Sequence, residues 1–470
     1  MKVQAFLKAN VLALLCKIII MNFSYAQDSP GTYLEIIQLT HNAGGHTINN
    51  TQCFSHDDQW IVYDTRNNDS MIGSTGSISM VNTLTGGIKE LYHTQNQTSS
   101  GPGVGAATFS PMINRVIFIH GIRNADKNNP YSFTRRTGVA VDIANPFHPI
   151  FMDARDIIPP FTPGALRGGT HAHNWSADGQ WISFTYNDYI LEKRGKTDPS
   201  LKDLRTVGVM IPGHAVKVNI DSAGENNNGE MFAVLVALVT ETPQPGSDEI
   251  SRAFDEGWIG NNGYQKSDGS WQHRALAFQG AIKNSDGTNK NEVFVLDLPD
   301  DLTKAITGLP LEGTISSRPN VPAGIIQRRV TFSSNGIVGP RHWLRCTPDG
   351  KLIAFLSKDD HGIIQVFGVS PNKRDIKQLT FNSHSVQGPF NFSPDGKRVA
   401  YLSANSVFIT EISTGKSKQV TPAYPEEEKP WGSVVWSNNG KMLAFNKFVA
   451  DGTTKNYFLQ VFLLKKGSTW

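Results

Sequence analysis

Apolar and polar positions alternate in short runs along most of this chain, and the runs come in pairs joined by a tight turn. The stretch Asn391-Phe-Ser-Pro-Asp-Gly-Lys-Arg-Val-Ala-Tyr is typical of a strand, a reversal and a second strand, because Pro-Asp-Gly favours a turn and β-rich residues follow. Six such stretches begin at Cys53, Thr108, Asn174, Cys346, Asn391 and Val435. The last three are about 45 residues apart, the period of a four-stranded propeller blade.

Counting these stretches predicts an all-β, seven-bladed β-propeller. Inner strands are expected near residues 51–55, 106–110, 172–176, 230–238, 343–347, 389–393 and 432–437. The fourth lacks the Asp-Gly turn, and a Gly-, Pro- and charge-rich insertion loop is expected after it, at about 241–272. The segment 32–40 ends in the Leu-Thr pair typical of the outer strands, whereas the C-terminal blade lacks an outer strand. Pairing the two ends would close the ring into a single domain over 27–470.

Residues 1–26 have the pattern of a signal peptide. Lys2 and Lys8 precede an apolar run, and Ser24-Tyr25-Ala26 offers a small-x-small cleavage site. A periplasmic or secreted location is therefore expected, and no later stretch is long and apolar enough to span a membrane. The remaining chain carries 41 acidic and as many basic side chains, which argues against nucleic acid as a partner.

Polar side chains gather at strand ends of blades 2 and 3, on the face opposite the Asp-Gly turns. His120 and Tyr186 end second strands, and Arg205 follows in the same loop as Tyr186. Further binding candidates on that face are Arg66, Arg123, Arg167, His171 and His173. Each alone is better explained as a hydrogen-bonded structural group, so only their shared position carries the functional interpretation.

A second group raises the question of a metal. His342 and Cys346 lie on one predicted inner strand, and His384 and Gln387 precede the next. Histidine and cysteine are zinc ligands when they converge, so a structural zinc is one interpretation, and a set of buried polar groups closing the channel is the other. Cys53 and Cys346 occupy equivalent repeat positions and are expected to be separate buried thiols. The chain has no G-x-S-x-G or Walker motif, which argues against a propeller-type serine peptidase.

Five longer stretches resemble the YidR family of exported bacterial propellers, whose function is unassigned. They are Phe118-Ile-His-Gly, Leu166-Arg-Gly-Gly-Thr-His-Ala-His-Asn-Trp-Ser, Asp203-Leu-Arg-Thr-Val-Gly-Val, Pro243-Gln-Pro-Gly-Ser-Asp-Glu-Ile and Pro340-Arg-His-Trp-Leu-Arg-Cys. The resemblance begins at about Leu34 and covers nearly all of the chain beyond it. The shorter repeats are similar to those of TolB-type periplasmic propellers.

The same pattern looks related to the seven-bladed ulvan lyases, which cut a sulfated, uronate-containing polysaccharide and in whose fold a structural zinc is reported. The resemblance implies that Tyr186, Arg205 and His120 match the catalytic Tyr, Arg and first His of that family. Where its second His is expected, this chain has Thr134 and Arg135. In β-elimination Arg205 would pair with the substrate carboxylate, and Tyr186, with its pKa lowered by neighbouring cations, would act as base and then acid.

Three hypotheses follow. The first is an exported polysaccharide lyase that cleaves a uronate-containing, ulvan-like glycan, with an acidic polysaccharide as its partner. The second is a non-catalytic TolB-like propeller that binds a protein or a glycan on its channel face, and the missing second His favours it. The third is a metal-dependent lyase akin to oligogalacturonate lyase, which would use His342, His384 and Gln387.

Overall fold

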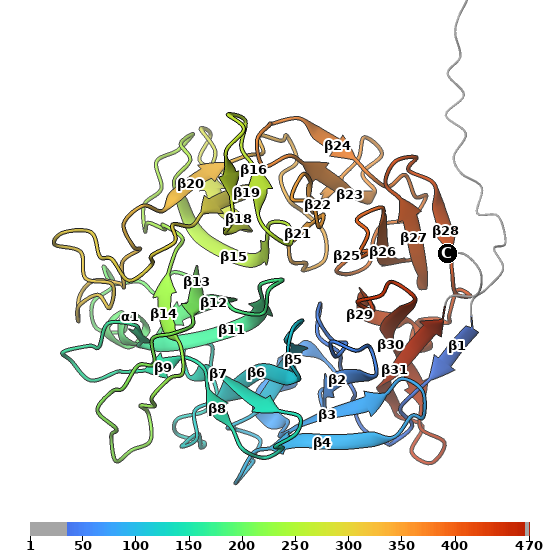
Figure 1. The fold of residues 1–470 in the computed structure, drawn as a ribbon, viewed down its shortest axis with the longest axis horizontal. Helices are drawn as coiled ribbons and strands as arrows, with labels where there is room; N and C mark the ends of the chain where they lie inside the picture. Colours follow the sequence, from blue (N-terminus) through green and yellow to red (C-terminus); the bar gives the residue numbers. More distant parts are fainter. Residues whose placement is uncertain (1–34, 466–469) are drawn as a thin grey trace, which may run out of the picture.

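The chain folds into seven antiparallel sheets arranged as blades around a central channel (Figure 1). A computed structural model describes residues 35–465 and 470. The predicted signal peptide lies outside this range. Among the described residues, no helix is both long enough and apolar enough to cross a membrane.

The blades follow the chain in order, each with its inner strand at the channel (Figure 1). Blade 1 is β2 (Trp60–Asp64), β3 (Ser77–Asn82) and β4 (Ile88–His93); blade 2 is β5 (Val104–Phe109), β6 (Arg115–Gly121), β7 (Arg136–Asp142) and β8 (Ile150–Phe151); blade 3 is β11 (Gly168–Trp175), β12 (Ile182–Asp188), β13 (Thr206–Ile211) and β14 (Phe232–Leu235); blade 4 is β15 (Ile250–Trp258), β18 (Ala275–Lys283), β19 (Asn289–Asp297) and β20 (Ile326–Arg329). Blade 5 is β21 (Arg345–Cys346), β22 (Ile353–Lys358), β23 (Ile364–Val369) and β24 (Ile376–Gln378); blade 6 is β25 (Asn391–Phe392), β26 (Arg398–Ser403), β27 (Ser406–Glu411) and β28 (Ser417–Gln419); blade 7 is β29 (Pro430–Trp436), β30 (Met442–Ala450), β31 (Tyr457–Lys465) and β1 (Glu35–Gln38).

Short accessory elements join or flank the blades. They are β9 (Ala154–Arg155), β10 (Ala165–Leu166), β16 (Tyr264–Gln265), β17 (Trp271–Gln272), the helix α1 (Tyr189–Arg194), and two 3-10 turns at Asp69–Ser74 and Glu426–Glu428. In blade 1 the segment that enters β2 pairs only through isolated bridges, such as Phe54 with Ile61.

The repeated turn is stabilised by its aspartate side chain and by the conformational freedom of its glycine. In blade 6 the Asp395 carboxylate accepts hydrogen bonds from Ser393 Oγ and from the Lys397 amide. Gly396 has a φ of 68°, a conformation that glycine adopts without steric cost. The turn therefore reverses the chain between β25 and β26.

The two ends of the chain meet in blade 7, as predicted. β1 is the outer strand of that blade and pairs antiparallel with β31, from Glu35 opposite Lys465 to Gln38 opposite Phe462. This pairing covers the free edge of β31 with a segment from the other end of the chain, so the ring is closed by hydrogen bonds.

The prediction for blade 4 is wrong. Phe232–Leu235 is the outer strand of blade 3, paired with β13, and the inner strand of blade 4 is β15. The predicted loop at 241–272 therefore contains β15 and the β16–β17 hairpin. β15 escaped recognition because its sequence, Ile-Ser-Arg-Ala-Phe-Asp-Glu-Gly-Trp, is interrupted by charges, and its pairing with β18 carries two register shifts.

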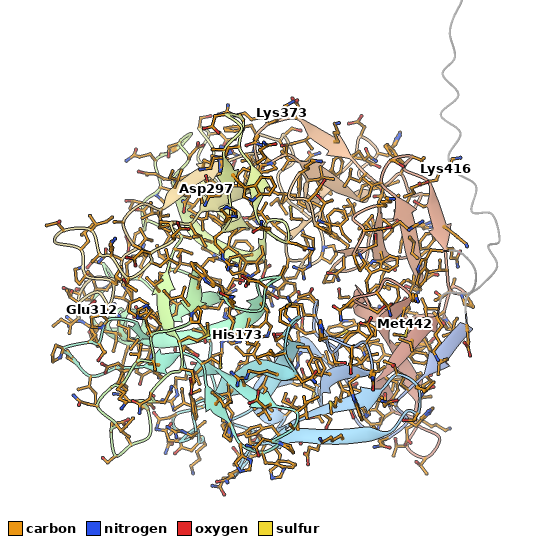
Figure 2. All side chains as sticks on the ribbon, viewed as in Figure 1. His173, Asp297, Glu312, Lys373, Lys416 and Met442 are labelled. Atoms are coloured by element: carbon orange, nitrogen blue, oxygen red, sulfur yellow. The ribbon has the colours of Figure 1, made fainter. Side chains whose placement is uncertain are left out.

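Side chains fill the wedges between neighbouring blades (Figure 2). Between blades 2 and 3, for example, Ile117, Ala140, Phe184 and Met210 belong to one buried cluster. Burial of apolar side chains at about 25 cal/mol per Å² is the main force holding adjacent blades together.

Candidate functional site

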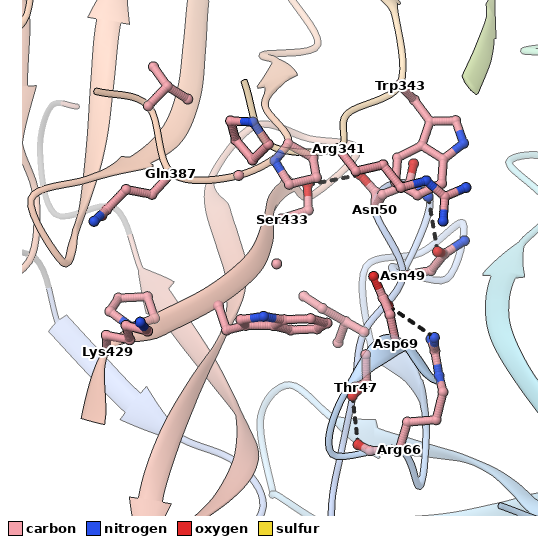
Figure 3. Close-up of a pocket in the computed structure, with 18 of the residues that line it drawn as sticks. Thr47, Asn49, Asn50, Arg66, Asp69, Arg341, Trp343, Gln387, Lys429 and Ser433 are labelled. Atoms are coloured by element: carbon pink, nitrogen blue, oxygen red, sulfur yellow. Dashed lines mark hydrogen bonds and ion pairs between the residues drawn. The ribbon is translucent and has the colours of Figure 1, made fainter. Parts of the chain in front are cut away.

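Arginines from three neighbouring blades line one cavity at the channel mouth. The cavity has a volume of about 330 Å³, and its lining includes Arg205 from the segment before β13, Arg252 and Asp255 from β15, and Arg341 from the segment before β21. We call it the cationic cavity. Pro340 and Arg341 also line a second cavity of about 440 Å³, on the side of blades 1, 5, 6 and 7 (Figure 3).

Positive charge in the cationic cavity is only partly neutralised. Arg341 pairs with Asp255, with 3.0 Å between Nη2 and Oδ1. Arg205 donates from Nε to the neutral Asn187 Oδ1, at 3.1 Å, and neither Arg205 nor Arg252 forms an ion pair in the described part of the chain. Burial, together with Arg252 and other nearby arginines, lowers the pKa of Arg205 to about 10. An anion entering this cavity would relieve the repulsion.

Arg136 lies behind this cavity and is also without a carboxylate partner among the residues that the structure describes. Its side chain is 2 % exposed, and Nη1 donates to the Tyr131 hydroxyl at 2.9 Å. Its Nε and Nη2 have no hydrogen-bond partner within the described residues. The exposed ring of Phe133 covers Arg136 at 4.8 Å and Arg205 at 5.2 Å, measured from each guanidinium carbon to the ring centroid.

His171 belongs to the same group. Its ring lies 6.4 Å from the Phe133 ring, and its Nδ1 lacks a partner among the described residues. Burial lowers the pKa of His171 well below 6.5, and Arg136 and Arg205 lower it further, so the imidazole is neutral at neutral pH. The side chain of His173, two residues later, lies in the wedge between blades 2 and 3, where its Nε2 is 3.0 Å from Thr170 Oγ1. Burial lowers the pKa of His173 to about 3.

Tyr186 does not lie at the channel mouth. It is 1 % exposed and packs in the apolar cluster between blades 2 and 3, where its hydroxyl donates to Asp188 Oδ2 at 3.2 Å. Burial, and next Asp188, raise the pKa of Tyr186 well above 10. The predicted lowering of this pKa is therefore wrong, because the partner of the hydroxyl is an anion and the wedge excludes water.

The structure does not bring Tyr186, Arg205 and His120 together. Arg205 contacts Asn187, the residue after Tyr186, whose side chain points to the opposite face of β12. His120 lies in another wedge, with Nε2 2.9 Å from the Tyr92 hydroxyl, and burial lowers the pKa of His120 to about 4. Of the three, only Arg205 lines the cationic cavity.

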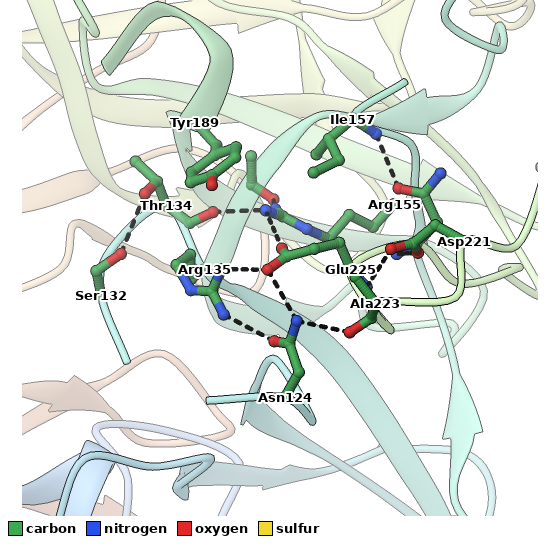
Figure 4. A network of polar contacts seen from close by, with 12 residues as sticks. Asn124, Ser132, Thr134, Arg135, Arg155, Ile157, Tyr189, Asp221, Ala223 and Glu225 are labelled. Carbon is green, nitrogen blue, oxygen red and sulfur yellow. Dashed lines mark hydrogen bonds and ion pairs between the residues drawn. The ribbon is translucent and has the colours of Figure 1, made fainter. Parts of the chain in front are cut away.

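Arg135, which stands near the expected second His, is neutralised inside the protein (Figure 4). It forms an ion pair with Glu225 and donates to Asn124 Oδ1 at 2.8 Å. Arg155 approaches the same carboxylate at 3.4 Å. Burial opposes ionisation of Glu225, but Arg155 and Arg135 hold its pKa below the usual value. We call this group the Glu225 cluster.

The other arginines that the sequence suggested also have internal partners. Arg66 binds Asp64, with Nε 2.7 Å from Oδ1, and Arg167 binds Asp188 at 2.9 Å. Arg123 donates to the Asn226 carbonyl at 3.3 Å and stacks over a phenylalanine ring. These contacts are those of structural arginines.

The predicted metal ligands do not converge. His342 Nδ1 lies 2.8 Å from the Pro340 carbonyl, and His342 Nε2 accepts from the Leu356 amide at 3.0 Å, so both ring nitrogens are occupied. Cys346 packs against the apolar cluster between blades 4 and 5, and burial raises the pKa of its thiol to about 12. His384 lies 3.0 Å from Ser383 Oγ, and Gln387 contacts Asn405.

Among the described residues no three His, Cys, Asp or Glu side chains are grouped as a metal site would require. Cys53 and Cys346 are both free thiols.

Sequence reasoning missed Arg136, Arg252, Asp255 and Arg341 as candidates. Arg136 directly follows Arg135, and only the direction of each side chain separates a paired arginine from an unpaired one. Arg252 and Asp255 lie in the segment interpreted as a loop. The unusual charge content of that segment was the available signal.

Comparisons with known proteins found relatives by sequence and by structure. Residues 103–225 match a family model described as a protein of unknown function, DUF3748. A curated relative, the uncharacterized protein YidR of Escherichia coli strain K12, is 38% identical over 416 residues, which cover 87% of this chain and 94% of the relative. Solved structures that resemble this one include oligogalacturonate lyase from Vibrio parahaemolyticus, with a TM-score of 0.47, 11% identity, and coverage of 95% of this chain and 97% of that chain. TolB from Acinetobacter baumannii aligns with a TM-score of 0.34 and 13% identity, over 89% of this chain and 84% of that chain.

Proposed function

The chain belongs to the YidR family, and on the geometry of its channel mouth we propose that it binds an acidic glycan there, in the periplasm or outside the cell. One observation carries the proposal. Arg205, Arg252 and Arg341 line the mouth and Arg136 lies behind them, and in the described chain Asp255 is the only carboxylate that pairs with any of the four.

The chemistry of the cavity fits a carboxylate better than a chain of phosphates. Arginine presents a planar fork that matches a carboxylate in a two-pronged pair. Three of the four arginines line one cavity, and the chain as a whole carries a formal net charge of only +3, so its net charge supplies little long-range attraction for a polyphosphate backbone. A uronate unit of a glycan offers one carboxylate on a compact ring.

Calorimetric titration tests this proposal. The probes are trigalacturonate and the neutral maltotriose, and trigalacturonate should bind while maltotriose binds at least tenfold more weakly. Arg205→Ala and Arg252→Ala should each weaken trigalacturonate binding about tenfold or more, since a hydrogen bond to a charged group contributes about 1.5–3 kcal/mol. Arg398→Ala, at the Asp-Gly turn of blade 6, is the control and should not alter binding. Equal binding of the two trisaccharides would overturn the proposal.

A second candidate function is β-elimination on the same ligand, and His171 favours it. A neutral imidazole with a free Nδ1 beside Arg136 and Arg205 can accept a proton from a carbon next to a neutralised carboxylate. In that reaction the C5–H bond breaks to the base, the C4=C5 double bond forms, and O4 leaves and takes up a proton. Phe133 covers this region, so its ring would have to turn aside to admit the sugar.

Absorbance of the new C4=C5 double bond, measured with ulvan and polygalacturonate, tests this candidate. Wild-type protein should release the unsaturated product, and His171→Ala should abolish its release while Arg205→Ala slows it. Tyr186→Phe separates this route from the one implied by the ulvan lyases, because it should leave turnover by His171 intact. Absence of product with every uronate polymer would contradict the lyase candidate, and binding of an acidic glycan would then be the remaining proposal.

The protein partner and the structural zinc that the sequence suggested stay predictions.

A further inference from the structure

The second cavity at the channel mouth differs in chemistry from the cationic cavity beside it. Its lining combines indole rings with side-chain amides, namely Trp343 and Trp431 with Asn49, Asn50, Gln387 and Asn405 (Figure 3). We call it the amide cavity. Pro340 and Arg341 line both cavities, so one extended ligand can occupy the two in succession.

Charges in the amide cavity are balanced. Arg66 is held by Asp64 and by Asp69, and Lys429 is held by Glu426. The Asp69 side chain is 60% exposed and faces the space where a ligand would lie. A second carboxylate bound here would meet this anion, and each cation that lines the cavity already has a carboxylate partner among the described residues, including Arg341, which pairs with Asp255.

The neutral groups of the amide cavity suit an uncharged sugar ring. Trp431, at the start of β29, is partly exposed, and no aromatic or cationic side chain of the described chain stacks on it. Trp343 is different, because Arg341 covers its ring at 4.4 Å. An indole offers a flat apolar surface with one polar edge, which matches the alternation of C–H faces and hydroxyls on a sugar.

The amides are held in place before any ligand arrives. Gln387 is exposed, and two bonds join it to Asn405: the backbone N–H of Asn405 donates to Gln387 Oε1 at 2.8 Å, and Gln387 Nε2 donates to Asn405 Oδ1 at 3.1 Å. Each side-chain amide retains donor and acceptor capacity for hydroxyl groups. Fixed polar groups lose little entropy when a ligand binds.

We propose that the amide cavity is a subsite for a neutral sugar unit, so that the natural ligand is a glycan in which a uronate adjoins an uncharged residue. This inference rests on the proposed function, because the uronate is placed by the cationic cavity. It excludes polymers in which every unit is acidic as preferred ligands.

Calorimetry with three probes tests the inference. They are glucuronate alone, tetragalacturonate with a carboxylate on every unit, and a hyaluronan tetrasaccharide in which glucuronate alternates with neutral N-acetylglucosamine. The alternating tetrasaccharide should bind at least tenfold more tightly than tetragalacturonate. Trp431→Ala should remove most of that advantage and leave the affinity for glucuronate unchanged. Asp69→Asn should improve tetragalacturonate binding severalfold, since it removes the opposing charge.

Gln387→Ala provides a second variant at an exposed position, in case Trp431→Ala does not fold, and it should weaken only the alternating probe. Equal affinity of the two tetrasaccharides, or an equal loss for glucuronate and the alternating probe in both variants, would overturn the neutral subsite while leaving the acidic one standing. Failure of all three acidic probes to bind would overturn the proposed function, and the neutral subsite with it.

Discussion

Arg135 and Arg136 are neighbours in the sequence, yet they lie in regions of opposite character. Arg135 belongs to the Glu225 cluster, where two arginines share one buried carboxylate. Arg136 lies behind the cationic cavity, where it donates only to the Tyr131 hydroxyl and two of its nitrogens are unpaired within the described residues. Both side chains are buried. The difference therefore lies in the partner and not in the residue type or its exposure.

The comparison separates stability from binding. A buried charge without a partner is strongly unfavourable. A fold that retains such a charge either uses it in function or is less stable because of it. The Glu225 cluster satisfies its charges internally and ties the loop before β7 to the segment that precedes β14. At the channel mouth, Arg136, Arg205 and Arg252 have no carboxylate partner within the described residues, which is the arrangement that the proposed acidic ligand would complete. Mutations in the Glu225 cluster should therefore lower stability and leave ligand binding intact, whereas mutations at the channel mouth should weaken binding without a loss of stability.

Glu225→Gln should have the largest effect. It leaves Arg135 and Arg155 buried without a counter-charge, and breaking a buried ion pair in this way costs about 3–5 kcal/mol of unfolding free energy. Urea denaturation measures the loss. Glu426→Gln, which removes an exposed ion pair with Lys429, is the matched control and should cost less than about 1 kcal/mol. Equal effects of the two variants would contradict the structural role of the cluster.

Glu256, in the wall beneath the mouth, should make stability depend on pH. It is fully buried, its Oε2 accepts from Thr185 Oγ1 at 2.8 Å, and burial raises its pKa from 4.5 to about 7. Because the folded-state pKa lies above the unfolded one, the contribution of Glu256 is complete below about pH 4.5 and is lost as pH rises through about 7.

The amplitude of that loss should be about 2–4 kcal/mol, and Glu256→Gln should remove it. The test compares urea denaturation of the wild type and the variant from pH 4.5 to 8. The comparison with the variant is needed because Asp153 and Asp203, whose pKa values burial raises to about 6, change stability in the same direction. Parallel curves for the two proteins would show that Glu256 does not titrate in this range.

The two adjacent arginines allow a direct test of the comparison. Arg136→Met removes an unpaired buried cation while keeping an apolar stem, so it should leave stability unchanged or raise it by about 1–2 kcal/mol, and it should weaken binding of trigalacturonate. Arg135→Met should lower stability and leave binding intact. Thermal unfolding and calorimetry on both variants check the four outcomes. A loss of stability in both would remove the distinction between the two regions.

The propeller blades could be predicted from the sequence because short local patterns specify their turns and strands. The turns Thr-Pro-Asp-Gly, Ser-Pro-Asp-Gly and Ser-Asn-Asn-Gly and the residues after them define blades 5, 6 and 7 directly, and the Leu-Thr ending indicates that β1 is an outer strand. β15 could not be predicted by the same signals, because its Arg252 and Asp255 serve the channel mouth and interrupt the apolar alternation.

The site could be predicted only in part for a related reason. Arg205 and His171 lie in or beside the cationic cavity, whereas the strand-end residues His120 and Tyr186 lie in wedges between blades. Whether an arginine there is free depends on carboxylates that are distant in sequence, such as Glu225 for Arg135, 90 positions away. No local pattern reports such a pairing. The same applies to Tyr186, whose face of β12 is decided by its neighbours in the wedge.

Tyr186→Phe should have the smallest effect, and it bears most directly on the catalytic interpretation. The substitution removes one hydrogen bond, from the hydroxyl to Asp188 Oδ2, and Asp188 keeps its pair with Arg167 and its bond to the Leu191 amide. The expected loss of unfolding free energy is about 1 kcal/mol. Binding of trigalacturonate should be unchanged, since Tyr186 lies in the wedge and Arg205 projects from the other face of the sheet. Asp188→Asn is the informative partner variant, because it weakens the pair with Arg167 and should cost more than Tyr186→Phe. Tyr186→Phe could instead abolish turnover of a uronate polymer without altering stability. The hydroxyl would then have to reach the substrate through an opening of the wedge between blades 2 and 3. That result would contradict the distinction between a structural wedge and a ligand-binding channel mouth.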